Sequence, residues 1–166
     1  MGEVWELIDL NEKKTGVLIE RGTGIPIPKG MYHVAVDIWV KGKDGKILLT
    51  QRHPDKPWGL KWECSGGAIV KGESPVDGAL RELQEETGIQ ILEDKLVCLG
   101  KTIMEEYQCI MYTYLVRLTD DVQLKLQEEE VVDAMWLESS ELENMREDIV
   151  CSVWDRYLQF RENIAR

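Results

Sequence analysis

One stretch near the middle of the chain carries signals for both ends of a helix. Ser74 and Pro75 form an N-cap followed by a proline in the first turn, and Asp77 stands where a capping box places its acidic partner. Gly88 is the residue type favoured just beyond a helix end. A helix is therefore predicted over 75–87, and the rest of the fold must be arranged around it.

Runs typical of β-strands lie on both sides of this helix. Residues 32–40 alternate in hydrophobicity, and a Lys-Asp-Gly turn joins them to 46–52 as a hairpin. Apolar residues at helical spacing over 149–158 predict a second helix. Further strands are expected over 4–8, 16–20, 62–70, 96–104, 107–118 and 129–137. This order predicts an α+β fold in one domain spanning 1–166, with N-terminal strands over about 1–30 and a core over about 31–166.

Three glutamates, Glu82, Glu85 and Glu86, form an acidic face on the predicted helix, beside an apolar one. At about 100° per residue they span an arc of roughly 100°. A solvated helix surface is the ordinary interpretation of such residues. However, like charges at this spacing repel, and the helix dipole disfavours the two in the last turn. Such a local conflict is expected mainly at functional sites, and carboxylates that converge from one helix suit Mg²⁺ or Mn²⁺.

The residues in and before this helix resemble the Nudix box, with every defining position filled. The pattern reads Gly67-x5-Glu73-x7-Arg81-Glu82-Leu83-x-Glu85-Glu86-x-Gly88-Ile89. The resemblance to the Nudix hydrolase superfamily implies an α/β/α sandwich with a mixed central sheet and a loop-helix-loop motif. It also implies an enzyme, a pyrophosphohydrolase. Its Mg²⁺ or Mn²⁺ would activate a water molecule that hydrolyses the diphosphate bond of a nucleoside diphosphate linked to another group.

Roles for single residues follow from this resemblance, position by position. It implies a metal site formed by Glu82, Glu85, Glu86 and a backbone carbonyl of Gly66 or Gly67. Arg81 would orient the carboxylates, and Glu73 would support the loop ahead of the helix. In this family the catalytic base is often a glutamate outside the helix. Two candidates are present here, Glu130 and Glu106, and each could equally be a solvated charge on an edge strand.

Basic residues and a tryptophan surround the loop that precedes the box. Arg52, Lys56, Lys61 and Lys71 could contact substrate phosphates, and Trp58 could stack on a base or ring. For each of them a turn residue, or a half-buried tryptophan, is an equally good interpretation. The substrate itself is expected to be a small molecule containing a diphosphate.

Two other functions remain open. Residues 5–9, 28–33 and 130–136 resemble the branch of the superfamily that includes isopentenyl-diphosphate isomerase. That enzyme has a catalytic cysteine where this chain reads Gly66-Gly67-Ala68, and Cys64 lies two residues too early. His33 fits one of its metal-binding histidines, but the chain has only two histidines in all. The second alternative is a Nudix-fold binding module without catalysis, which would typically have lost box residues that this chain keeps.

Charge and composition exclude several other classes of protein. The net charge of −11 argues against a scaffold for nucleic acids, which requires a basic face. The four cysteines are widely spaced and signal neither a zinc site nor a disulfide framework. No apolar run is long enough to cross a membrane, and the first residues do not resemble a signal peptide, so a cytoplasmic protein is expected. The amphipathic C-terminal helix is expected to cover the core, with a homodimer contact as the alternative.

Overall fold

The computed structural model describes residues 2–166, and its strands flank the predicted helix as the sequence indicates. The strands are β1 (Val4–Ile8), β2 (Lys14–Glu20), β3 (His33–Lys41), β4 (Ile47–Arg52), β5 (Trp62–Glu63), β6 (Ser65–Ala68), β7 (Val97–Met104), β8 (Cys109–Arg117) and β9 (Val131–Leu137). The helices are α1 (Pro75–Thr87), α2 (Ser139–Asn144) and α3 (Cys151–Ala165), with short 3-10 turns η1 (Glu93–Lys95), η2 (Glu105–Tyr107) and η3 (Arg146–Asp148).

The central sheet has seven strands and mixed direction. Its main path is β5-β4-β3-β8-β7, while β6 also pairs with β3 and β9 with β4. The β3–β8 pair is parallel, with Asp37 opposite Thr113, and the other pairs are antiparallel. A parallel pair requires a long crossover connection, and here α1 lies within it. The α+β class and the mixed sheet predicted from the sequence are both confirmed.

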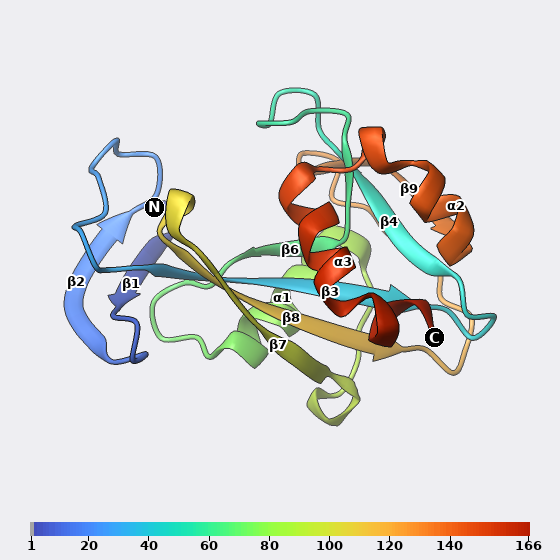
Figure 1. The fold of residues 1–166 in the computed structure, drawn as a ribbon, viewed down its shortest axis with the longest axis horizontal. Coiled ribbons are helices and arrows are strands. Elements are labelled where there is room, and N and C mark those ends of the chain that lie inside the picture. The colour runs from blue at the N-terminus through green and yellow to red at the C-terminus, as the bar shows by residue number, and fades with distance from the viewer. Residues whose placement is uncertain (1) are drawn as a thin grey trace.

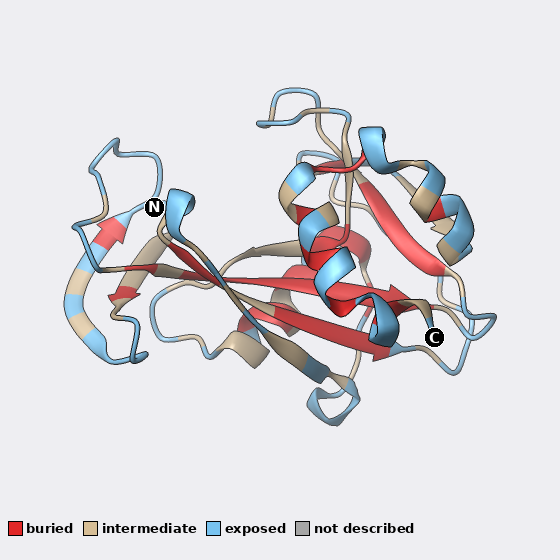
Figure 2. Ribbon diagram, viewed as in Figure 1, coloured by how far each residue is buried: buried red, intermediate tan, exposed pale blue. Residues whose placement is uncertain are grey.

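Helices cover both faces of this sheet (Figure 1). On one face, Ala79 and Leu83 of α1 pack against Val36 and Ile38 of β3. On the other face, α3 packs against residues that include Trp39. Because successive side chains of a strand point to opposite faces, β3 supplies both cores and is buried almost throughout, as Figure 2 shows for the central strands.

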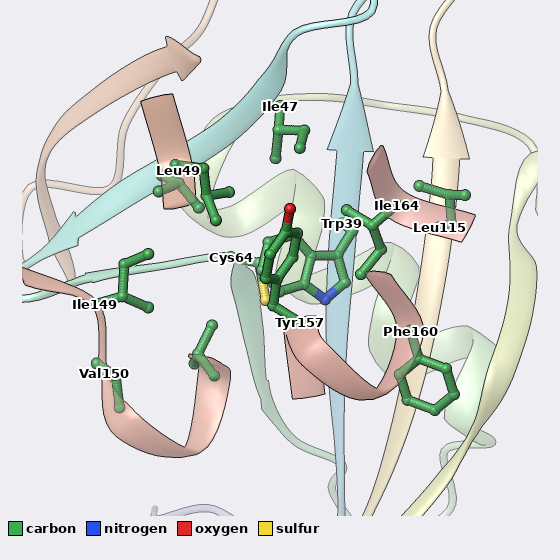
Figure 3. Close-up of a cluster of buried hydrophobic side chains, with 12 residues drawn as sticks. Trp39, Ile47, Leu49, Cys64, Leu115, Ile149, Val150, Tyr157, Phe160 and Ile164 are labelled. Atoms are coloured by element: carbon green, nitrogen blue, oxygen red, sulfur yellow. The ribbon is translucent and has the colours of Figure 1, made fainter. Parts of the chain in front are cut away.

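The core under α3 is built around two aromatic rings. Trp39 and Tyr157 are fully buried and lie 5.6 Å apart between ring centroids (Figure 3). Cys64 packs into the same cluster from the chain between β5 and β6. This is also where the single strand expected over 62–70 is divided. Trp62 and Glu63 pair with β4, whereas Ser65 to Ala68 pair with β3, so the chain changes partner at Cys64.

Helix α1 begins and ends where the sequence predicts. The Ser74 side chain accepts a hydrogen bond from the Asp77 N–H, the Asp77 carboxylate accepts one from Ser74, and Gly88 adopts φ +75°. The local signals were sufficient because both caps depend only on residues within a few positions of the helix ends.

Residues 4–20 form a separate hairpin attached to the end of the sheet. Strands β1 and β2 pair only with each other. The hairpin is joined to the domain by the Ile8–Tyr32 bridge and by a 2.7 Å hydrogen bond from the Lys71 N–H to the Val4 carbonyl. Within residues 2–166 all four cysteines are free, and none of the helices has the length and apolarity needed to cross a bilayer.

Gly66 is required by the close approach of β6 to β3. A Cβ atom at this position would overlap the backbone carbonyl oxygen of Val36, which cannot move without breaking the sheet. In chemical denaturation we expect Gly66→Ala to lower the free energy of unfolding by about 1–3 kcal/mol, the range for an extra methyl group in a closely packed position. The control is Gly2→Ala, where the new Cβ would meet only the flexible side chain of Glu20. Equal stability of the two variants would contradict this account.

Candidate active site

A cavity of about 470 Å³ opens beside the acidic face of α1. Glu82, Glu85 and Glu86 line one side of it. The hairpin β1–β2 lines another, and the loop between β4 and β5 a third. The deep end reaches β3 and the first turns of α3. Elements from the whole length of the chain therefore meet at the glutamates that the sequence singled out.

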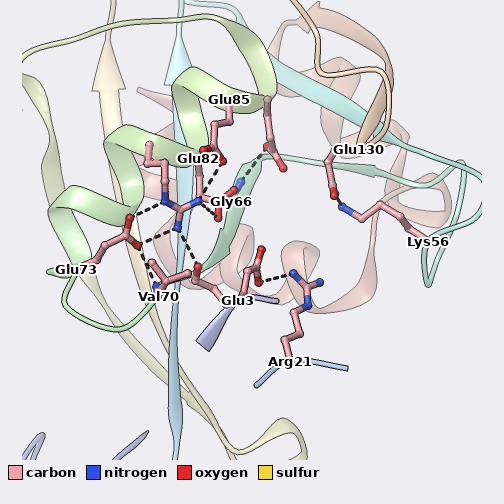
Figure 4. Close-up of polar contacts among 12 residues, drawn as sticks. Glu3, Arg21, Lys56, Gly66, Val70, Glu73, Glu82, Glu85 and Glu130 are labelled. Carbon is pink, nitrogen blue, oxygen red and sulfur yellow. Dashed lines mark hydrogen bonds and ion pairs between the residues drawn. The ribbon is translucent and has the colours of Figure 1, made fainter. Parts of the chain in front are cut away.

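The guanidinium of Arg81 connects the loop before α1 to the acidic face. Its Nε and Nη2 donate to the two oxygens of Glu73, at 2.6 and 2.9 Å (Figure 4). Its Nη1 donates to Glu82 at 2.8 Å and to Glu85 at 3.2 Å, and Nη2 also reaches the Ala68 carbonyl at 3.2 Å. Burial raises the pKa of Glu73, but the bonds from Arg81 and from the Val70 N–H outweigh it, so this pKa lies below its usual value. The carboxylates are thus held in fixed positions by one cation.

Glu82 and Glu86 are buried, so the acidic face is not a solvated surface. Only 9% of Glu82 and 5% of Glu86 are exposed, whereas the side chain of Glu85 is 49% exposed. Burial raises the pKa of both, and for Glu86 the charges of Glu63 and Glu82 raise it further. Two desolvated carboxylates of like charge are costly unless a cation offsets them.

The donor set of this site fits a hard divalent cation. Its groups are carboxylate oxygens, the ligand type that Mg²⁺ and Mn²⁺ prefer. Gly67 leaves space beside them, because a Cβ atom there would overlap the carboxylate of Glu82. Within residues 2–166 no three acidic, histidine or cysteine side chains are already converged as a cage. The reason is that Arg81 holds Glu82 and Glu85, while Glu86 accepts a 3.2 Å hydrogen bond from the Gly66 N–H.

The candidate bases and substrate residues have different places in the structure. Glu130 forms an ion pair with Lys56, and both line the cavity (Figure 4). Glu106 instead lines a neighbouring, smaller pocket. Arg52 also lines the cavity, but its guanidinium is bonded to both oxygens of Glu63 at 2.7 Å. Glu130 is therefore the candidate base that faces the acidic helix.

The remaining candidates for substrate binding, Trp58, Lys61 and Lys71, do not all lie at the cavity. Trp58 lies at the cavity, with its ring edge-on to Tyr107 at 6.3 Å between centroids. Lys61 bonds to the backbone carbonyl of Glu147. Among the described residues, neither Lys61 nor Lys71 is part of the cavity lining. The structure therefore brings Trp58 to the site and does not bring these two lysines.

The hairpin contributes further residues to the site. Glu3, Trp5 and Arg21 line the cavity, and Arg21 pairs with Glu3 at 2.8 Å. The Trp5 ring stacks on His33 at 4.3 Å between centroids, and burial lowers the pKa of His33 to about 4. The sequence singled out residues 5–9 and His33 only through the resemblance to the isomerase branch, and nothing marked Glu3 or Arg21, because they reach the site only when the hairpin folds against the sheet.

Comparisons with known proteins agree on the kind of domain. A family model described as the NUDIX domain matches residues 31–151. A Nudix hydrolase of Listeria monocytogenes is 33% identical over 150 residues, which cover 87% of this chain and 85% of that one. A Deinococcus radiodurans protein has the same fold, with a TM-score of 0.69 at 20% identity over 84% of this chain and 86% of that chain.

A second solved structure with this fold contains ligands. It is a bifunctional NMN adenylyltransferase/ADP ribose pyrophosphatase of Francisella tularensis in complex with AMP and a manganese ion. Its TM-score is 0.66 at 20% identity, covering 84% of this chain and 43% of that chain. At this identity the likeness shows the fold, and the chemistry must be argued from the residues of this chain.

Removal of the Arg81 guanidinium should destabilise the protein. We expect Arg81→Gln to lower the free energy of unfolding by about 2–4 kcal/mol, because it leaves Glu73 and Glu82 without their cation in a half-buried setting. The control is Arg166→Gln, which removes an ion pair whose side chains are 79% and 84% exposed and should cost less than about 0.5 kcal/mol. Similar denaturation midpoints for the two variants would show that the network is not structural.

Proposed function

We propose that this chain, which belongs to the Nudix superfamily, hydrolyses the diphosphate bond of a small nucleoside diphosphate derivative with Mg²⁺ or Mn²⁺. The observation that carries this proposal is the pair of buried carboxylates, Glu82 and Glu86, beside a large cavity. A divalent cation bound at this pair would offset its negative charge and link it to an anionic substrate. A nucleoside diphosphate is the first class to test, since the Francisella protein of the same fold binds AMP and manganese.

The metal would be held by Glu82, Glu85, Glu86 and the backbone carbonyl of Gly67. When bound, a divalent cation neutralises phosphate oxygens and lowers the pKa of a coordinated water. The chain itself supplies the residues that orient these carboxylates. Arg81 fixes the carboxylates of Glu82 and Glu85, and Glu73 in turn fixes Arg81.

Cations and a candidate base lie around this centre. Lys56 and Arg21 line the same cavity and would offset the charge of the diphosphate. Glu130 is the proposed acceptor of the proton from the attacking water, and its ion pair with Lys56 fixes its carboxylate at the cavity. Trp58 offers a flat surface for a ring, while Arg52 acts through Glu63 rather than on the substrate.

The first prediction concerns metal dependence. Hydrolysis of ADP-ribose, nucleotide sugars or dinucleoside polyphosphates should disappear in excess EDTA and return with Mg²⁺ or Mn²⁺, because the carboxylates of the acidic face can hold phosphate oxygens only through a bound cation. Release of nucleoside monophosphate, followed by chromatography, is the measurement. Turnover that persists in EDTA would rule out the proposed role of the acidic face.

The second prediction concerns Glu86. Glu86→Gln should lower kcat by about a hundredfold or more through loss of a metal ligand. Its stability should be unchanged or higher, because the substitution removes a buried charge next to Glu63 and Glu82. Steady-state kinetics and thermal unfolding measure the two effects. Glu93→Gln, in η1 and away from the cavity, is the matched control and should behave as wild type. Wild-type turnover in Glu86→Gln would count decisively against the metal assignment.

A further inference from the structure

The deep end of the cavity contains a buried ion pair that the proposed hydrolysis does not use. Asp37 lies on β3 and Arg156 on α3, and the Nε of Arg156 donates to Oδ2 of Asp37. The two residues are only 3% and 4% exposed, yet both line the cavity. The pair lies between β3 and α3, whereas the proposed metal-binding glutamates belong to α1 on the opposite side of the sheet. The pair is called the polar floor below.

The polar floor keeps hydrogen-bonding capacity that the protein does not satisfy. Oδ1 of Asp37 is buried and has no hydrogen-bond partner within residues 2–166. The Nη1 of Arg156 lies 3.5 Å from the sulfur of Met104, which is a weak acceptor. A free carboxylate oxygen therefore lies beside a guanidinium that has donors to spare.

A purely structural role accounts poorly for this arrangement. Burying an ion pair is costly, and well-packed apolar residues of similar size are often at least as stable. An unsatisfied buried oxygen adds to that cost. Conflicts of this kind are expected mainly at functional sites. Arg156 also lies outside residues 31–151, the part of the chain that the family model matches.

The walls around the polar floor are mostly apolar or weakly polar, and Glu63, a carboxylate near Arg156 that also lines the cavity, is paired with Arg52. They include Val150, Val153 and Met104, together with the buried thiols of Cys64 and Cys109. A sugar would leave several hydroxyl groups without partners between such walls. A flat ring with one N–H donor beside one acceptor would satisfy both members of the pair. The edge of a nucleobase carries such a donor and acceptor. The cavity volume is within the range of sites for ligands of this size.

We propose, resting on the proposed function, that Asp37 and Arg156 form a specificity subsite for the nucleobase of the substrate. Oδ1 of Asp37 accepts a hydrogen bond from an N–H of the base, and Arg156 donates to the neighbouring ring nitrogen or carbonyl. The phosphates then extend from this subsite toward the acidic face of α1 and the cations Lys56 and Arg21.

A binding measurement tests this proposal without any hydrolysis. AMP, GMP, CMP and UMP have no diphosphate bond, and ribose 5-phosphate lacks the base. Their dissociation constants are measured by calorimetry with Mg²⁺ present. We expect wild type to bind at least one nucleotide about tenfold or more tightly than ribose 5-phosphate. In Asp37→Asn this preference should fall about tenfold, while the affinity for ribose 5-phosphate stays unchanged. Asp155→Asn, an exposed residue of α3 outside the cavity lining, should keep the wild-type preference.

A second variant separates recognition from stability. Asp37→Leu together with Arg156→Met replaces the pair by apolar side chains, so the fold does not depend on an unpaired buried charge. It should also lose the preference for nucleotides, with its folding checked by thermal unfolding. The proposal is overturned if a folded double variant keeps the wild-type preference, or if wild type binds no nucleotide more tightly than ribose 5-phosphate. Either result leaves metal-dependent hydrolysis as a separate question, because these ligands have no diphosphate bond.

Discussion

The network around Arg81 is the interaction on which the rest of the site depends. One guanidinium contacts Glu73, Glu82, Glu85 and the Ala68 carbonyl, so it joins the end of β6 and the loop after it to adjacent turns of α1. Without this cation, carboxylates of like charge would repel at the buried end of a helix whose dipole also disfavours them. Arginine suits this role better than lysine because its planar fork can serve several acceptors in fixed directions.

Strand β3 separates the two ends of the cavity, because its alternate side chains point to opposite faces of the sheet. Its even-numbered side chains, such as Val36 and Ile38, pack under α1, and its odd-numbered ones, such as Asp37 and Trp39, face α3. Gly66 and Gly67 of β6 lie opposite Asp37 and Val36 in the sheet. Because glycine has no side chain, the backbone of β6 can lie close to β3 at Gly66 and to Glu82 at Gly67. The proposed metal site and the polar floor therefore lie on different sides of β3 and line the same cavity.

Residues on both sides of the part that the family model matches also line the cavity. The hairpin before residue 31 supplies Trp5 and Arg21, and α3 supplies Arg156. The matched part of the domain holds the proposed metal ligands together with other lining residues such as Asp37 and Lys56.

The sequence by itself determined what depends on neighbouring residues. Helix α1, its caps and the positions of its glutamates follow from local hydrogen bonds and from a period of about 3.6 residues, and the resemblance carried by those residues led to the right family and fold. Only the tertiary structure decided that Glu82 and Glu86 are buried, that Glu130 rather than Glu106 faces the acidic helix, and that Lys61 turns to a backbone carbonyl. The pairing of Asp37 with Arg156 joins residues 119 positions apart, and that of Lys56 with Glu130 joins residues 74 apart. No local pattern encodes such contacts, because they form only when the sheet and the helices that cover it have packed together.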